Sequence, residues 1–194
     1  MVQYAKYVGE RDMHKDIDRL IVSEEQIAAK VKDVAAWLDE KFKDAEVPPL
    51  AISVLKGSVF FFCDVVRSMQ TPVQLDFMTV SSYGNSTKSS GLPKIVMDLS
   101  ASVENRDVIL IEDIVDSGYT LMRMRNLIFG RGAKSFTVVS LLDKPVRRNM
   151  PVKADYTCFE VGDEFVVGYG LDYAQQYRNL PYIGVLKREI YEKE

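Results

Sequence analysis

The sequence predicts an α/β fold, with a mainly parallel, twisted sheet flanked by helices and a small hood subdomain formed by the terminal segments. Two observations support this. Between residues 23 and 142, short apolar runs of strand length alternate with segments of helical periodicity, and such alternation is typical of a parallel sheet with helices on its faces. After Pro145, strand-like segments follow one another without another long helical period. Ligands of such sheets bind at the carboxyl ends of the strands.

The first predicted helix follows Ser23. Ser23 and Gln26 match a capping box, in which each side chain bonds the backbone of the other residue. Apolar residues then recur at helical spacing over roughly five turns, namely Ile27, Val31, Val34, Leu38 and Phe42. Pro48 and Pro49 end this element.

The next elements are a strand, a helix and a pair of strands. Residues 50–55 are an apolar run of strand length, and Ser58 is expected to cap a helix that packs through Phe61, Phe62, Val65 and Val66. Residues 73–80 alternate in polarity, which predicts a strand with Val73, Leu75 and Phe77 on its apolar face. Its expected partner is the strand at residues 94–99.

Residues 106–111 form the most apolar strand candidate. They precede a helix through Leu121, Met124, Leu127 and Ile128, which is expected to end at Gly130 because glycine suits the left-handed C′ position. Residues 136–142 predict another buried strand. The last strand-like segments are 154–161, 165–173 and 182–187.

Composition favours a soluble globular protein with small-molecule ligands. The chain has 194 residues, 47% of them apolar and 27% charged, which suits a single domain over residues 1–194. A net charge of −3 gives no reason to expect nucleic acid, which is bound through excess Lys and Arg. No signal peptide or membrane span is visible, so a cytoplasmic protein with Cys63 and Cys158 as buried, reduced thiols is expected.

The stretch VILIEDIVDSGYTL at residues 108–121 combines two opposite demands. Its small residues lie between a strand and a helix, where backbone N–H groups and the helix terminus can hold a phosphate. Its carboxylates would repel that phosphate unless they face sugar hydroxyls or a cation such as Mg²⁺. A phosphorylated ribose with a metal satisfies both demands. The alternative is that Asp116 or Ser117 caps the helix while Glu112 and Asp113 are solvated acids.

This stretch resembles the signature with which type I phosphoribosyltransferases bind 5-phosphoribosyl-1-pyrophosphate (PRPP). Further blocks resemble the hypoxanthine-guanine branch of that family: LKGS at 55–58, SSYG at 81–84, LLDKPVRR at 141–148 and FVVGYGLDYAQQYRNLPYIGVL at 165–186. The resemblance covers the chain from about residue 15 to its end, in family order. It implies purine salvage, in which N9 of hypoxanthine, and of guanine, attacks C1 of the PRPP ribose and pyrophosphate leaves.

The resemblance also implies roles for individual residues. Asp116 would be the catalytic group that takes the N7 proton of the purine. Glu112 and Asp113 would hold the ribose diol and the metal, and Asp172 would also ligate Mg²⁺. The 5′-phosphate would lie against the loop formed by Asp116, Ser117, Gly118, Tyr119 and Thr120.

Lys56, Gly57 and Arg178 would bind pyrophosphate, and a cis Leu55–Lys56 peptide bond is expected in this loop. The residues expected around the base are Lys144, which would bond O6 of a 6-oxopurine, with Phe165, Val166 and Asp172. Without the family, each has a simpler interpretation. Lys56 would be a solvated turn residue, Lys144 a surface lysine, Phe165 a core residue and Asp172 a turn residue.

Residues 81–92 are too polar to pack and too long for a tight hairpin, which predicts either a mobile lid or an exposed linker. Ser82 and Tyr83 match the family's closing loop over pyrophosphate. Tyr119 departs from the family members that carry lysine there, which puts the strength of PRPP binding in question. His14 has no cysteine or histidine companion and is assigned no metal or catalytic role.

Two rival functions stay open on the sequence alone. One is transfer to another purine, such as xanthine. The other is a PRPP-fold regulator that binds nucleotides or RNA without useful catalysis, which the acidic net charge disfavours. The resemblance further implies a homodimer or homotetramer.

Overall fold

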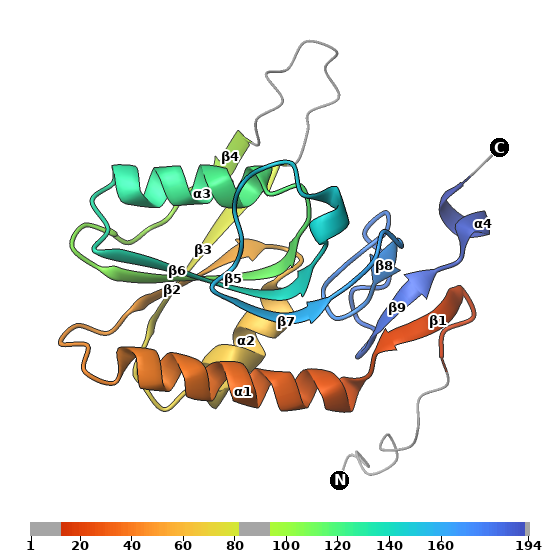
Figure 1. Ribbon diagram of the computed structural model, residues 1–194, viewed down its shortest axis with the longest axis horizontal. Coiled ribbons are helices and arrows are strands. Elements are labelled where there is room, and N and C mark those ends of the chain that lie inside the picture. Colours follow the sequence, from red (N-terminus) through yellow and green to blue (C-terminus); the bar gives the residue numbers. More distant parts are fainter. Residues whose placement is uncertain (1–12, 82–93, 193–194) are drawn as a thin grey trace, which may run out of the picture.

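A computed structural model describes residues 13–81 and 94–192 of the chain and has the predicted α/β architecture (Figure 1). Its main sheet has six strands in the order β4-β3-β2-β5-β6-β7. All neighbouring pairs are parallel except β3 and β4, which are antiparallel. The strands are β2 (Leu50–Leu55), β3 (Gln74–Ser81), β4 (Lys94–Met97), β5 (Asp107–Val115), β6 (Ser135–Asp143) and β7 (Tyr156–Glu160).

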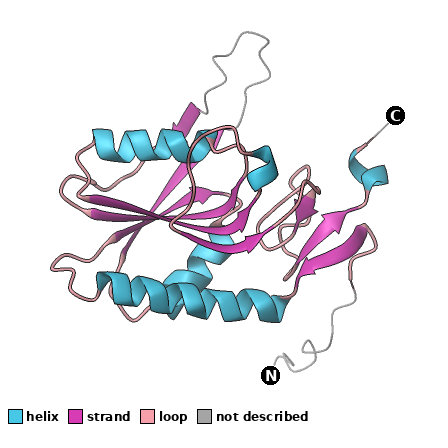
Figure 2. Cartoon of the chain, viewed as in Figure 1, coloured by secondary structure: helices cyan, strands magenta, loops and turns pink. Residues whose placement is uncertain are grey.

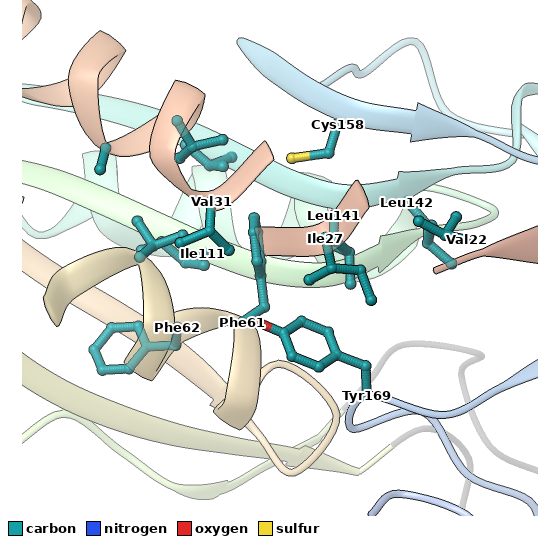
Figure 3. Packing of buried hydrophobic residues seen from close by; sticks show 14 of the residues in the cluster. Val22, Ile27, Val31, Phe61, Phe62, Ile111, Leu141, Leu142, Cys158 and Tyr169 are labelled. Carbon is teal, nitrogen blue, oxygen red and sulfur yellow. The ribbon is translucent and has the colours of Figure 1, made fainter. Parts of the chain in front are cut away.

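Helices cover both faces of this sheet (Figure 2). On one face lie α1 (Glu24–Phe42) and α2 (Val59–Ser68), and on the other lies α3 (Tyr119–Gly130), with a 3-10 turn η1 (Pro145–Arg147) after β6. Each face has its own apolar core, as a sheet buried on both sides requires. Figure 3 shows the first core, where Phe61 and Phe62 of α2 lie beneath Val31 of α1 and Ile111 of β5.

The hood is a separate three-stranded sheet in the order β1-β9-β8. It joins β1 (Ile17–Val22) from the start of the chain to β8 (Val166–Val167) and β9 (Ile183–Leu186), and it is followed by the short helix α4 (Arg188–Tyr191). Both pairings are antiparallel. The hood predicted from the terminal segments is thus confirmed, although β1 was not predicted as a strand and β8 is much shorter than residues 165–173.

The first helix is as predicted. The capping box of Ser23 and Gln26 is present, and all five of the expected apolar positions are buried. The predicted cap of α2 is wrong: Ser58 occupies the N-cap position without a side-chain cap bond. Its hydroxyl instead lies 2.7 Å from that of Ser53 and donates to the Val54 carbonyl at 2.8 Å. Both serines are buried, so their hydroxyls bond to the protein in place of water.

The predicted apolar face of β3 is confirmed in part. Val73 and Phe77 pack against the first core, but Leu75 is 51% exposed, whereas Asp76 is only 6% exposed. The Asp76 carboxylate accepts bonds from the backbone N–H groups of Ser100 and Ala101, each at 2.8 Å. These long-range donors allow a carboxylate to be buried, and they lie outside the window in which alternation is read.

Three smaller corrections follow from local geometry. Helix α3 does end at Gly130, but the left-handed residue is Gly132, with φ of +79°. Strand β5 continues to Val115, so Glu112 and Asp113 belong to the strand and not to the turn. Cys158 is buried as expected and Cys63 only partly, and both are free thiols. No helix in the described residues has the length and apolar character of a membrane span.

Candidate active site

A cavity of about 600 Å³ opens where β2 and β5 end and α3 begins. This is the edge of a parallel sheet at which ligands bind. Its lining brings together the predicted turn beside β2, the acids of β5 and the small-residue loop, and it includes Gly57, Val80, Glu112, Asp113, Asp116, Ser117, Gly118, Tyr119, Thr120 and Asn149.

Two carboxylates in this lining have oxygens without a protein partner. Glu112 is 6% exposed, and within the described residues its Oε1 atom and the Oδ1 atom of Asp116 are buried and receive no hydrogen bond. Buried polar atoms are nearly always paired, so such exceptions require an explanation. A ligand that donates hydrogen bonds, or a cation, would supply the missing partners. This contradicts the interpretation of Glu112 as a solvated acid.

Asp113 lies directly against the loop that follows β2. A Cβ atom on residue 57 would lie 1.5 Å from Oδ2 of Asp113, so Gly57 permits this close approach. Burial raises the pKa of Asp113 to about 6, with a further contribution from the charge of Asp172 and an opposing one from Arg178. Burial also raises the pKa of Glu112 well above its usual range, with Asp113 adding to the effect. The ligand-free site therefore holds negative charge with difficulty.

The loop before α3 presents a helix N-terminus that no side chain caps. Gly118, with φ of +88°, is the N-cap residue, and it makes no side-chain cap bond. The alternative in which Asp116 or Ser117 caps the helix is therefore wrong. The Ser117 carbonyl accepts hydrogen bonds from the backbone N–H groups of Asn149 and Met150, at 2.9 and 3.1 Å. An uncapped N-terminus leaves backbone donors available for an anion.

Arg148 is a site residue that the sequence analysis missed. Its guanidinium donates to the carbonyls of Asp116 at 2.9 Å and Val115 at 3.0 Å, and it is paired with Asp143. It thus fixes the backbone at the start of the small-residue loop from outside the cavity. No local signal distinguishes it from Arg147, which is half exposed and paired with Asp163.

We expect Arg148→Lys to raise the Kd of the loop for a phosphorylated ribose about tenfold, because one ammonium group cannot bond both carbonyls and a charged hydrogen bond contributes about 1.5–3 kcal/mol. Calorimetry with ribose 5-phosphate measures this effect. Arg147→Lys is the matched control, for which an unchanged Kd is expected. Equal Kd values for the two variants would contradict a role of Arg148 in holding the loop.

The residues expected around the base lie beside this cavity and not in its lining. Lys144 is 6% exposed, so it is not the surface lysine of the simpler interpretation. Its ammonium donates to the Glu164 carbonyl at 2.7 Å. Burial lowers the pKa of Lys144, and Arg147 lowers it further. Val166 is buried in β8.

Phe165 presents an aromatic face at the edge of the hood. Its side chain is 37% exposed, which excludes the interpretation of this residue as core. Its ring stacks on that of Tyr191 with centroids 5.0 Å apart and meets the edge of Tyr173 at 5.6 Å. A partly exposed, immobilised ring can act as a stacking platform for a planar base.

A polar network joins the predicted pyrophosphate and metal residues. Asp172 Oδ1 is paired with Arg178 at 2.8 Å, and its Oδ2 accepts from the N–H of Gln175, also at 2.8 Å. The side chain of Gln175 lies 3.2 Å from the Lys56 ammonium and 3.4 Å from Arg178. The Leu55–Lys56 peptide bond is cis, as expected. Ser82 and Tyr83 lie outside the described residues.

The described residues contain no cluster of three or more His, Cys, Asp or Glu side chains that could hold a metal ion by themselves. Mg²⁺ usually binds one or two carboxylates together with substrate phosphates and waters. The unpartnered Glu112 oxygen fits that donor chemistry. Asp113 and Asp172 add carboxylate oxygens, and those of Asp172 already contact Arg178 and Gln175.

Comparisons with known proteins agree with this geometry. Residues 21–174 match the family model described as a phosphoribosyl transferase domain. The chain is 54% identical to hypoxanthine-guanine phosphoribosyltransferase of Bacillus subtilis, covering 93% of this chain and 99% of that protein. It is 46% identical to the protein of the same name from Streptococcus thermophilus, with coverage of 93% and 99%. A crystal structure of hypoxanthine phosphoribosyltransferase from Staphylococcus aureus superposes with a TM-score of 0.87 at 42% identity, covering 95% of this chain and 99% of that chain.

Proposed function

Because this chain belongs to the phosphoribosyltransferase family, in its hypoxanthine-guanine branch, we propose that it transfers the 5-phosphoribosyl group of PRPP to N9 of hypoxanthine and guanine. The products are the nucleotide monophosphates IMP and GMP, with pyrophosphate. One observation carries the proposal: a single cavity joins an uncapped helix N-terminus to buried carboxylates without partners. Phosphorylated ribose is a ligand that satisfies both.

In this proposal the two ends of PRPP are held by different chemistry. Backbone N–H groups and hydroxyls of Ser117, Gly118, Tyr119 and Thr120 bind the 5′-phosphate. Glu112 and Asp113 accept hydrogen bonds from the ribose diol, which supplies the partner that Glu112 lacks. Binding both ends fixes C1 for attack, and such positioning accounts for much of the rate in transfer reactions.

Asp116 is the proposed catalytic residue. The bond from C1 to pyrophosphate breaks as the bond from N9 to C1 forms, and the purine then carries a proton at N7 that must leave. The free Oδ1 of Asp116 is an acceptor for that proton. A positioned acid or base of this kind contributes about 10²–10⁴-fold to a rate.

The remaining residues orient the base and the leaving group. Lys144 donates to O6 of the base, Phe165 stacks on its ring, and Val166 offers backbone groups to its edge. Lys56, Gly57 and Arg178 hold pyrophosphate. Asp172, Glu112 and Asp113 are the residues that would hold Mg²⁺, whose charge offsets that of the leaving pyrophosphate.

The test is to incubate the purified protein with PRPP, Mg²⁺ and, separately, hypoxanthine, guanine, xanthine, adenine and orotate. Chromatography then measures the nucleotide monophosphates. IMP and GMP are the expected products. Product from adenine or orotate alone would overturn the proposal, and PRPP binding without any product would favour a regulator.

Lys144→Gln is expected to raise the KM for hypoxanthine by about 10- to 100-fold and to leave the KM for PRPP nearly unchanged. The reason is that the charged hydrogen bond to O6 contributes about 1.5–3 kcal/mol. Kinetics with each substrate varied in turn separates the two constants. Lys153→Gln, on an exposed side chain, is the control. A rise in both constants would indicate that Lys144 supports the fold and not the base.

The assembly and the compartment are also part of the proposal. Family resemblance supports a homodimer or homotetramer in the cytoplasm, with PRPP and 6-oxopurines as the small-molecule partners. Sedimentation of the purified protein tests the assembly. A monomer under conditions where IMP is formed would exclude it.

A further inference from the structure

The hood turn at residues 168–170 has an unusual backbone. Three consecutive residues have positive φ: Gly168 at +105°, Tyr169 at +46° and Gly170 at +103°. Glycine adopts such angles freely, whereas a bulky aromatic residue rarely does. A residue in a sparsely populated conformation persists only where its surroundings hold it, and such residues cluster at functional sites. The contacts of Tyr169 therefore indicate what this turn is for.

Tyr169 is held at its backbone, its ring and its hydroxyl. Its N–H donates to the Leu180 carbonyl at 2.8 Å, and its ring is buried in the core between the sheet and α2. Its hydroxyl donates to Oδ2 of Asp64 on α2 at 2.6 Å. Figure 3 shows the ring extending from the hood toward the helix that carries Phe61 and Phe62. Burial and the bond to Asp64 raise the pKa of Tyr169, so the hydroxyl remains a donor at neutral pH.

The two segments joined by this bond carry opposite walls of the proposed pyrophosphate site. Helix α2 begins directly after the loop of Lys56 and Gly57. The turn leads into Asp172, and Arg178 donates to the Gly170 carbonyl at 2.6 Å. The backbones of the two walls lie in close contact. A Cβ atom added to Gly170 would lie 1.9 Å from the Gly57 carbonyl oxygen, so only glycine fits at residue 170.

We propose that Tyr169 is a positioning residue for the pyrophosphate half of the site. Its hydroxyl, bonded to Asp64, keeps the turn in contact with Gly57, and this turn leads into Asp172 and accepts the bond from Arg178. Tyr169 does not touch the reacting atoms and acts through these three residues. The inference rests on the proposed function and extends it, because it assigns the binding of pyrophosphate a support on α2.

Tyr169→Phe removes only the hydroxyl and keeps the buried ring. We expect it to raise the KM for PRPP, and the Kd for pyrophosphate with Mg²⁺ measured by calorimetry, by about two- to tenfold, since one hydrogen bond contributes about 0.5–1.5 kcal/mol. The KM for hypoxanthine should change less than twofold. Asp64→Ala should reproduce this split. Asp64→Asn should keep the wild-type constants, because an amide oxygen still accepts the bond from Tyr169.

The double variant Tyr169→Phe, Asp64→Ala should be no worse than either single variant, which is the signature of two residues that act through one contact. Tyr177→Phe is the matched control. Tyr177 also has positive φ in the hood, and its hydroxyl donates to Asp16 at 2.9 Å. That variant should lose thermal stability without losing pyrophosphate affinity.

An unchanged pyrophosphate Kd in Tyr169→Phe, additive losses in the double variant, or an equal loss in Tyr177→Phe would each overturn the inference. None of these outcomes would affect the proposed function, which requires only that the wild-type protein convert PRPP and hypoxanthine into IMP. Absence of that product from the wild-type protein would instead remove the proposed function itself.

Discussion

Asp116→Asn is expected to lower kcat about 10²- to 10³-fold and to change the KM for PRPP less than about threefold. Asparagine keeps the size of the side chain and leaves the backbone of the phosphate loop in place. Its amide, unlike a carboxylate, cannot accept the N7 proton of the purine. The Oδ1 atom that would take this proton is buried and unpartnered, so the only ion pair lost with the charge in the described residues is the one between Oδ2 and Arg147, at 3.9 Å.

Steady-state kinetics with both substrates varied measures the two effects separately. Asp163→Asn is the matched control, because Asp163 and Asp116 both lie beside the Arg147 guanidinium, and Asp163 has no proposed role. Its kcat should stay at the wild-type value. Parallel losses of kcat and PRPP affinity in Asp116→Asn would instead indicate that Asp116 holds the loop, with no separate part in proton transfer.

Elements set by local chemistry were predictable from the sequence. The capping box and the helical spacing of apolar residues locate α1, and the apolar run at residues 50–55 matches β2. Prediction failed where a distant contact overrides local pattern. Asp76 is buried because the backbone of Ser100 and Ala101 satisfies it, and no alternation of polarity near Asp76 contains that information.

The residues of the candidate site also fall into those that the sequence predicts and those that only the structure identifies. The residues of the 108–121 stretch that line the cavity are contiguous and follow directly from the motif. Lys144, Phe165 and Asp172 required the resemblance to a family, because each has an ordinary structural interpretation when taken alone. Arg148 and Tyr169 act through backbone carbonyls and a side chain far away in sequence, so only the folded structure identifies them.

Asp113→Asn is expected to stabilise the ligand-free protein at pH 8 by about 1–3 kcal/mol, which raises Tm by roughly 2–10 °C for a chain of this size. Burial raises the pKa of Asp113 from 3.8 to about 6, so the folded state binds this proton more tightly than the unfolded state. Stability from that proton is present below the ordinary pKa and is lost as pH rises through the window from about 4 to 6. Asparagine carries no charge, so the variant does not lose this stability as pH rises.

Thermal unfolding of both proteins between pH 4 and 8 measures the difference. The Tm gap should be widest at pH 8 and should narrow toward pH 4, where the folded protein keeps the Asp113 proton and the unfolded chain has bound it in part. The order should reverse with saturating PRPP and Mg²⁺, which stabilise whichever protein binds them, because the variant lacks a carboxylate for the ribose diol and the cation. A Tm gap independent of pH would show that packing against Gly57, and not the buried charge, separates the two proteins. The buried acid needed for ligand binding thus lowers the stability of the ligand-free protein. The bound ligand then contributes the interactions that the empty site lacks.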